Sequence, residues 1–122
     1  MHKDVADRLI AALESGKYAK GRCRLRTNAR HPDGPDKWCC LGVLCDILGV
    51  PAFDAGGTTD GVTYGNAMDN SRGYLPEFVR QQAGMRTISG WLPVNISLTR
   101  LNDASDTFEP VIAAIREHWA SI

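Results

Sequence analysis

The chain has 122 residues, of which 43% are hydrophobic and 23% charged, and this composition predicts one globular domain over residues 1–122. It excludes a disordered, collagen-like or fibrous chain. Fourteen Lys and Arg residues balance fourteen Asp and Glu residues, so the formal net charge is zero. We therefore expect no attraction of the whole protein to nucleic acid or to an acidic membrane, and any anion must bind a local cationic patch.

No apolar run reaches the roughly 20 residues that a membrane-spanning helix needs. Residues 1–15 are typical of an amphipathic helix and lack the pattern of a cleavable export signal. These features predict a soluble, cytoplasmic protein with no membrane partner.

The four cysteines are Cys23, Cys39, Cys40 and Cys45. Their spacing contains no Cys-x-x-Cys pair and does not favour a zinc site. Adjacent Cys39 and Cys40 cannot readily bridge each other, and without an export signal we expect reduced thiols. The simplest interpretation is that Cys40 and Cys45 are small hydrophobic core residues.

Apolar periodicity predicts five helices. The first begins with Asp4 as its N-cap and ends at Gly16. The most apolar stretch, 38–50, predicts a buried central helix, in which Gly42 indicates the close approach of another element. Three shorter helices are predicted further along the chain: one over 75–84, one capped by Ser97, and one capped by Thr107 or Asp106 after an Asn102–Asp103 turn.

Residues 18–27 alternate apolar and basic side chains, which predicts a half-buried strand. Cys23 and Leu25 would face inward, and the outer face would be strongly cationic. The Gly-rich stretch 51–73 predicts a long loop, in which 62–64 forms a short strand. These elements predict an α+β domain of about five helices around a buried central helix, with a small antiparallel sheet or hairpin.

The strongest functional signal is a cluster of positive charge. Between positions 17 and 32 lie six of the fourteen cationic residues and no acidic residue: Lys17, Lys20, Arg22, Arg24, Arg26 and Arg30. Alternate arginines on a strand present planar guanidinium groups, which suit phosphate or carboxylate. The alternative is that these arginines pair with the chain's own acids on a solvated face.

Aromatic and amide side chains add to this candidate site. Tyr64, in the Gly-rich stretch, is a candidate ligand contact, although it could equally anchor the loop. The predicted ligand- or anion-binding residues are Lys20, Arg22, Arg24, Arg26, Tyr64 and Asn102.

Catalytic patterns are sparse. His31 with Cys23 or Cys39 is the only pairing of a nucleophile with a base worth considering, and capping explains Asp103 and Asp106 more simply than acid–base chemistry does. No common nucleotide-hydrolase, metalloprotease or EF-hand motif is present. We expect a non-catalytic protein without metal or cofactor, and an enzyme that uses a cysteine or aspartate is the weakest alternative.

Three segments carry a resemblance to a known family. They are Trp-Cys-Cys-Leu-Gly-Val-Leu-Cys-Asp at 38–46, Leu75-Pro76-x-x-Val79, and Leu101-Asn102-Asp103 followed by Phe108 and a terminal helix. In this order and spacing the chain resembles a family of small, mostly uncharacterised proteins encoded by tailed bacteriophages and prophages. The likeness covers nearly the whole chain, but Gln82 stands where the family pattern has an aromatic residue.

The resemblance implies a small protein that acts on host physiology or host defence in the host cytoplasm. With the arginine cluster, it predicts a non-catalytic binding protein that sequesters a small phosphorylated or nucleotide-like ligand, in a pocket that a homo-oligomer completes. The alternative is a protein–protein inhibitor or adaptor whose arginine face docks on a host enzyme. Nucleic-acid binding is disfavoured because a neutral chain lacks a broad cationic face.

Overall fold

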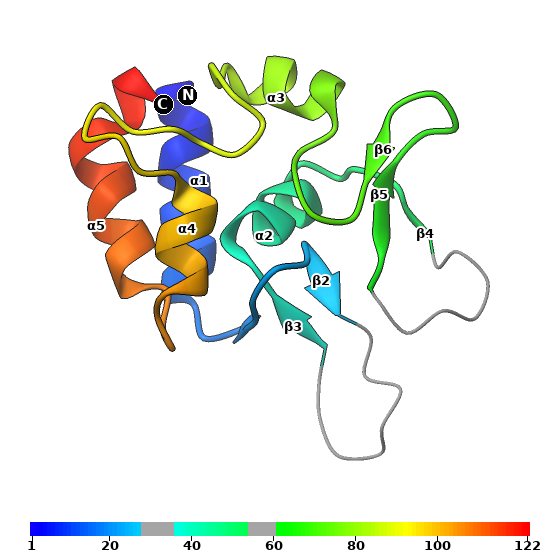
Figure 1. Ribbon diagram of the computed structural model, residues 1–122, viewed down its shortest axis with the longest axis horizontal. Coiled ribbons are helices and arrows are strands. Elements are labelled where there is room, and N and C mark those ends of the chain that lie inside the picture. The colour runs from blue at the N-terminus through cyan, green and yellow to red at the C-terminus, as the bar shows by residue number, and fades with distance from the viewer. Residues whose placement is uncertain (28–35, 54–60) are drawn as a thin grey trace.

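Within the described residues, four helices and six short strands surround a fifth, central helix. The computed structural model describes residues 1–27, 36–53 and 61–122. The helices are α1 (Lys3–Glu14), α2 (Cys40–Ile47), α3 (Glu77–Ala83), α4 (Leu98–Asp103) and α5 (Glu109–His118), and a 3-10 turn follows at Trp119–Ser121. Helices α1, α4 and α5 lie together on one side of α2, and the strands lie on the other (Figure 1).

The strands form two three-stranded sheets. The first has the order β1-β3-β2, from β1 (Ala19–Lys20), β2 (Arg26–Thr27) and β3 (Lys37–Trp38). The second has the order β4-β5-β6, from β4 (Ala52–Phe53), β5 (Thr63–Gly65) and β6 (Asn70–Ser71). All pairs are antiparallel except β1–β3, which is parallel. The α+β class is confirmed, and β5 confirms the predicted strand at 62–64 with a shift of one residue.

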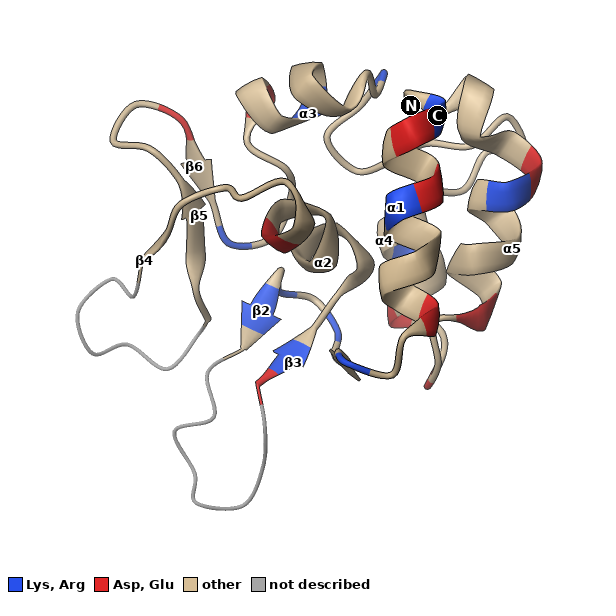
Figure 2. Cartoon of the chain, turned by 180° about the vertical axis from the view of Figure 1, so that it is seen from behind, with Lys and Arg blue, Asp and Glu red and all other residues tan. Residues whose placement is uncertain are grey.

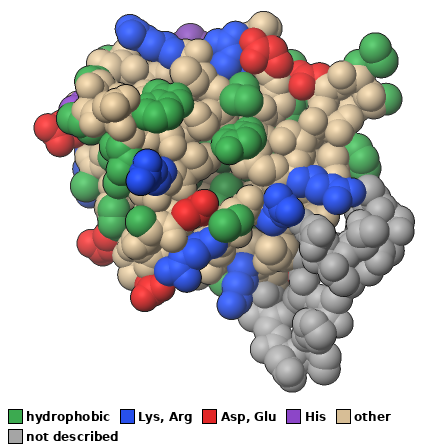
Figure 3. All heavy atoms as spheres, viewed as in Figure 1, with side chains coloured by type: hydrophobic (Ala, Val, Ile, Leu, Met, Phe, Trp, Pro, Cys, Tyr) green, Lys and Arg blue, Asp and Glu red, His purple; other side chains and the backbone are tan. Residues whose placement is uncertain are grey.

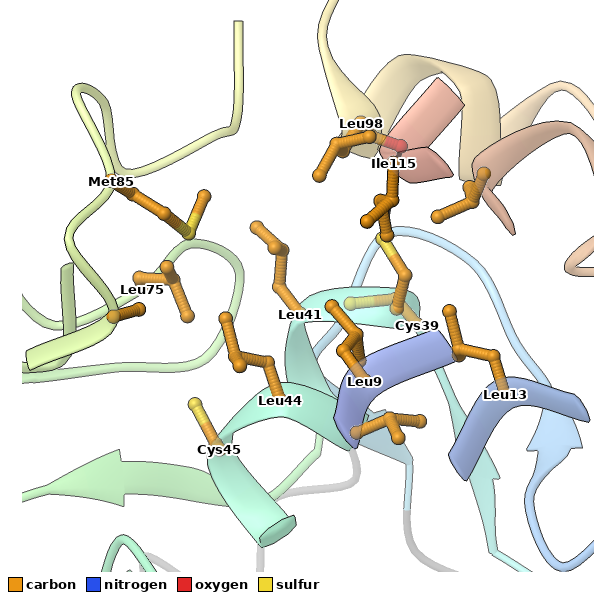
Figure 4. Close-up of a cluster of buried hydrophobic side chains, with 14 of the residues drawn as sticks. Leu9, Leu13, Cys39, Leu41, Leu44, Cys45, Leu75, Met85, Leu98 and Ile115 are labelled. Carbon is orange, nitrogen blue, oxygen red and sulfur yellow. Dashed lines mark hydrogen bonds between the residues drawn. The ribbon is translucent and has the colours of Figure 1, made fainter. Parts of the chain in front are cut away.

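Helix α2 is the centre of the core, as its apolar sequence predicted. The side chains of Cys40, Leu41, Val43, Leu44 and Cys45 are all 0% exposed. Figure 4 shows Leu41, Leu44 and Cys45 in one cluster with side chains from α1 and from the segments that follow α2. The prediction that Cys40 and Cys45 serve as core hydrophobes is therefore confirmed.

Gly42 lets the chain before β2 lie directly against α2. A Cβ atom at this position would stand 1.7 Å from the Leu25 carbonyl oxygen, far inside van der Waals contact. The Cys39 backbone N–H also donates to that oxygen over 3.1 Å. The close approach that the glycine indicated is confirmed, and its partner is Leu25.

Helix ends differ from the predictions in particular places. Helix α1 has His2 at its N-cap and not Asp4, because the His2 backbone N–H donates to the Ala83 carbonyl and fixes an earlier start. Ser97 caps α4 as predicted, with its hydroxyl accepting from the Arg100 N–H. The predicted Asn102–Asp103 turn is wrong, since both residues lie within α4. None of the helices within the described ranges is long and apolar enough to cross a membrane.

Candidate anion-binding pocket

Residues 21–25 form a sharp bend, and the single strand predicted over 18–27 is wrong. Only its ends pair, as β1 and β2. Cys23 has a positive φ of 66°, and the Arg24 N–H donates to the Arg22 carbonyl over 2.8 Å. Cys23 is therefore exposed, although Leu25 is buried as expected. Arg22, Arg24 and Arg26 do not share one strand face.

Three hydrogen bonds from other elements hold this bend. The Asp103 carboxylate accepts from the Cys23 N–H over 2.9 Å. The Leu25 N–H donates to the Arg72 carbonyl over 2.7 Å, while its own carbonyl accepts from Cys39. Because α4, the β6 end and the start of α2 all bind this short segment, its alternating pattern cannot extend into a ladder.

Lys20 and Arg22 hold this segment against α4. The Lys20 ammonium donates to the Asn102 carbonyl over 2.5 Å, and burial together with Arg22 lowers the pKa of Lys20. The Arg22 guanidinium donates to the Asp103 carbonyl over 2.9 Å and pairs with the Asp106 carboxylate. Both side chains therefore donate hydrogen bonds within the chain. Arg22 also pairs with one of the chain's own acids, as the alternative interpretation of the arginines expects.

Arg26 and Tyr64 also serve the fold. The Arg26 guanidinium pairs with Asp36 over 2.5 Å and stacks 4.6 Å from the centre of the Trp38 ring. Tyr64 is 1% exposed, and burial raises the pKa of its phenol to about 12. Because β5 carries its ring into the core, Tyr64 does not line the pocket described below, which fits the alternative that it anchors this segment.

Asn102 is likewise an internal residue, and it does not line the pocket described below. Its side chain is 0% exposed. The amide nitrogen donates to the Gly21 carbonyl over 3.0 Å, and the amide oxygen accepts from the Cys40 N–H over 3.1 Å. The buried amide therefore links α4 to two other segments, the chain that enters the bend and the start of α2.

Of the six predicted residues, Arg24 is the one that lines the pocket beside this bend. The pocket has a volume of about 390 Å³. Its walls are the bend, the start of α2, the segment before α3, and α4, which contributes Ser97, Thr99 and Arg100. Arg100 was not predicted, because nothing in the sequence brings α4 to the bend.

The pocket carries a local positive charge. Arg24 and Arg100 are exposed, and within the described ranges neither side chain forms an ion pair. The Asp103 carboxylate also lines the pocket, but it already accepts hydrogen bonds from Cys23 and Asn102. Two free guanidinium groups against one occupied carboxylate leave the pocket suited to an anion.

The wider charge distribution agrees with a cationic region here. Lys and Arg residues lie on the first sheet and on the chain that leads into it, whereas Asp and Glu residues lie largely on the helices (Figure 2). On the face drawn in Figure 3, Lys and Arg side chains form a band across the lower half. Arg30 of the predicted cluster, and His31 of the predicted pairing with Cys23 or Cys39, lie outside the described residues.

Two thiols line the same pocket, with different exposure. Cys23 is exposed, whereas Cys39 is 3% exposed and accepts from the Gly42 N–H at the start of α2. Burial raises the pKa of the Cys39 thiol to about 11, so it is protonated at neutral pH. Among the described residues no group of His, Cys, Asp and Glu could hold a metal ion.

One comparison with known proteins identifies a family. The family model described as "Domain of unknown function (DUF8296)" matches residues 1–119, so the chain belongs to this family. No curated protein and no solved structure matches the chain.

Proposed function

We propose that this member of the DUF8296 family is a non-catalytic protein that binds and sequesters a small phosphorylated ligand. The proposal rests on one observation, the placement of Arg24 and Arg100 in the same pocket. The two residues come from distant parts of the chain, line one pocket and have no ion-pair partner among the described residues.

Guanidinium groups fit phosphate for a geometric reason. Each presents several N–H donors in one plane, and two of them can contact two oxygens of the same phosphate. The Thr99 hydroxyl, which also lines the pocket and shares a 2.9 Å hydrogen bond with the Ser97 hydroxyl, offers a further contact for a phosphate or a sugar. A phosphate would add negative charge beside Arg24 and Arg100, whose two positive charges exceed the single negative charge of Asp103 in this pocket.

The protonation state of the pocket supports binding without turnover. A cysteine nucleophile must be a thiolate with a base nearby, and of the two thiols in the pocket Cys39 does not meet this condition, because burial raises its pKa to about 11. The described residues that line the pocket include no histidine. Sequestration requires binding without a chemical step, and the side chains that line the pocket are suited to binding.

The resemblance to proteins of tailed bacteriophages supports the host cytoplasm as the place where this protein binds its ligand. A protein that holds a phosphorylated signal in the host cytoplasm removes that signal from the host's defence. We include a homo-oligomer in the proposal, because a second copy would close a pocket that lies at the surface of one chain. Light scattering on purified protein measures the number of copies.

A thermal-shift screen tests the proposal directly. The probes are pyrophosphate, ribose 5-phosphate, mononucleotides, cyclic nucleotides and ADP-ribose. A ligand that binds only the folded state raises the melting temperature, and the rise grows with the logarithm of ligand concentration above its Kd. Recovery of the ligand intact separates sequestration from turnover.

Matched arginine variants locate the binding. Arg24→Gln and Arg100→Gln each remove a charge-assisted contact and should weaken binding about 10- to 100-fold. Arg116→Gln is the control, since Arg116 pairs with Glu14 on the surface of α5 and is outside the pocket. Equal binding by all three variants, or no shift with any probe, would overturn the proposal.

A second candidate function is inhibition of a host protein, and an exposed apolar turn favours it. The turn at 92–95 closes with a hydrogen bond from the Asn95 N–H to the Leu92 carbonyl over 3.1 Å. It leaves Trp91 46% and Val94 63% exposed. If this function is correct, a host protein retained by the wild type should be lost with both Trp91→Ala and Val94→Ser and kept with Arg24→Gln.

A further inference from the structure

The pocket has an aromatic side as well as a cationic one. Tyr74 lines it, is 53% exposed, and has no side-chain hydrogen bond or ring contact with the other described residues. A half-exposed tyrosine ring with no partner offers a flat surface on which another ring can stack.

The backbone beneath Tyr74 is held in place, so the ring has a fixed base. The Tyr74 N–H donates to the Ser71 hydroxyl over 3.1 Å, and the next N–H, of Leu75, donates to the Ile88 carbonyl over 3.1 Å. One residue earlier, Gly73 lies beside the bend, because its Cβ position would be 3.7 Å from the Cys23 carbonyl. Tyr74 is thus anchored next to the segment that carries Arg24.

The two sides of the pocket call for a ligand with two parts. Arg24 and Arg100 favour an anionic group, and Tyr74 favours a planar ring. The volume of about 390 Å³ falls within the range of small-molecule sites. In Figure 3 hydrophobic side chains border the band of Lys and Arg side chains on the same face.

We infer that the ligand is a nucleotide whose phosphates lie between Arg24 and Arg100 and whose base stacks on Tyr74. This inference rests on the proposed binding of a phosphorylated ligand and narrows it to one chemical class. Inorganic phosphate and sugar phosphates would satisfy the arginines but leave the tyrosine ring unused.

Isothermal titration with ADP, pyrophosphate and ribose 5-phosphate tests the inference. Wild-type protein should bind ADP about tenfold or more tightly than either of the other probes, from stacking of the base. Tyr74→Ala should remove this preference and leave the affinity for pyrophosphate unchanged. Tyr74→Phe, which keeps the ring and loses only the hydroxyl, should retain the preference.

The outcomes separate this inference from the broader proposal. If pyrophosphate binds as tightly as ADP, or if Tyr74→Ala leaves ADP binding unchanged, the nucleotide inference is overturned while phosphate binding stands. If none of the three probes binds the wild type, both are overturned. Because the Tyr74 side chain has no partner among the described residues, Tyr74→Ala should fold with an unchanged melting temperature, which a scan without ligand checks.

Discussion

The Asn102 amide oxygen accepts a hydrogen bond from the Cys40 backbone N–H over 3.1 Å, and both residues are 0% exposed. The same side chain donates to the Gly21 carbonyl over 3.0 Å. One amide therefore fastens α4 both to the start of α2 and to the chain that enters the bend. Since α4 carries Arg100 and the bend carries Arg24, Asn102 helps to set the spacing of the two guanidinium groups.

Replacing Asn102 should destabilise the protein more than replacing an exposed asparagine. Asn102→Ala leaves the Cys40 N–H and the Gly21 carbonyl without these partners, so we expect a loss of about 1–3 kcal/mol in the free energy of unfolding. Asn70→Ala is the control, because Asn70 is exposed and should lose less than about 0.5 kcal/mol. Urea denaturation measures both, and equal losses would contradict a bridging role for Asn102.

The contact between Gly42 and Leu25 gives a sharper prediction. Gly42→Ala places a methyl group 1.7 Å from the Leu25 carbonyl, so α2 must separate from the chain before β2. We expect a loss of about 3 kcal/mol or more, or failure to fold.

Gly49→Ala is the matched control for this prediction. Gly49 has a φ of +69° but open space around its Cβ position, so only backbone strain of about 1 kcal/mol is expected. Circular dichroism at increasing urea ranks the two variants. A folded Gly42→Ala protein no less stable than Gly49→Ala would show that the close contact is not required.

The helices could be predicted from the sequence because their patterns match the packing that they adopt. Leu9 and Leu13 of α1 and the apolar run of α2 are buried together, so local period and tertiary environment agree. The prediction of a strand over 18–27 was wrong because the alternation of apolar and basic residues in this segment came from spaced arginines. Hydrogen bonds from Asp103 and Arg72 decide its course, and local pattern contains no trace of them.

The candidate site could be predicted only in part. Charge density pointed to the right segment, and Arg24 does line the pocket. The sequence did not point to Arg100 and gave no reason to choose Tyr74 among the aromatic residues that could stack a base, because only the fold brings α4 and the segment before α3 to the bend. For Tyr64 the sequence left a ligand contact and an anchoring role open, and the pairing of β5 on both edges buries the ring.

The four thiols should differ in reactivity. Cys23 is exposed, whereas Cys39 is 3% exposed and Cys40 and Cys45 are 0% exposed. A small disulfide reagent should therefore modify one thiol rapidly in the folded protein and all four after unfolding. Cys23→Ser should remove the rapid phase and leave the slow reaction of the other thiols. A rapid phase that persists in this variant would contradict the burial of the other three thiols.

The buried thiols also predict how stability changes in alkaline solution. Burial raises the pKa of Cys39 to about 11 from its ordinary value of 9.0, and it raises the pKa of Cys40 and Cys45 as well. The folded protein thus holds these protons more tightly than the unfolded chain does. The Cys39 contribution to stability is complete below about pH 9 and is lost as the pH rises to about 11.

Cys39→Ser isolates this contribution, because a serine hydroxyl does not ionise in this range and serine is a favourable helix N-cap. Urea unfolding at about pH 8 and about pH 10.5 should show a steep loss of stability in the wild type. The loss in Cys39→Ser should be smaller, since one of the raised pKa values is gone while Cys40 and Cys45 remain. If the two proteins lose the same stability over this interval, ionisation of Cys39 does not limit the folded state at high pH.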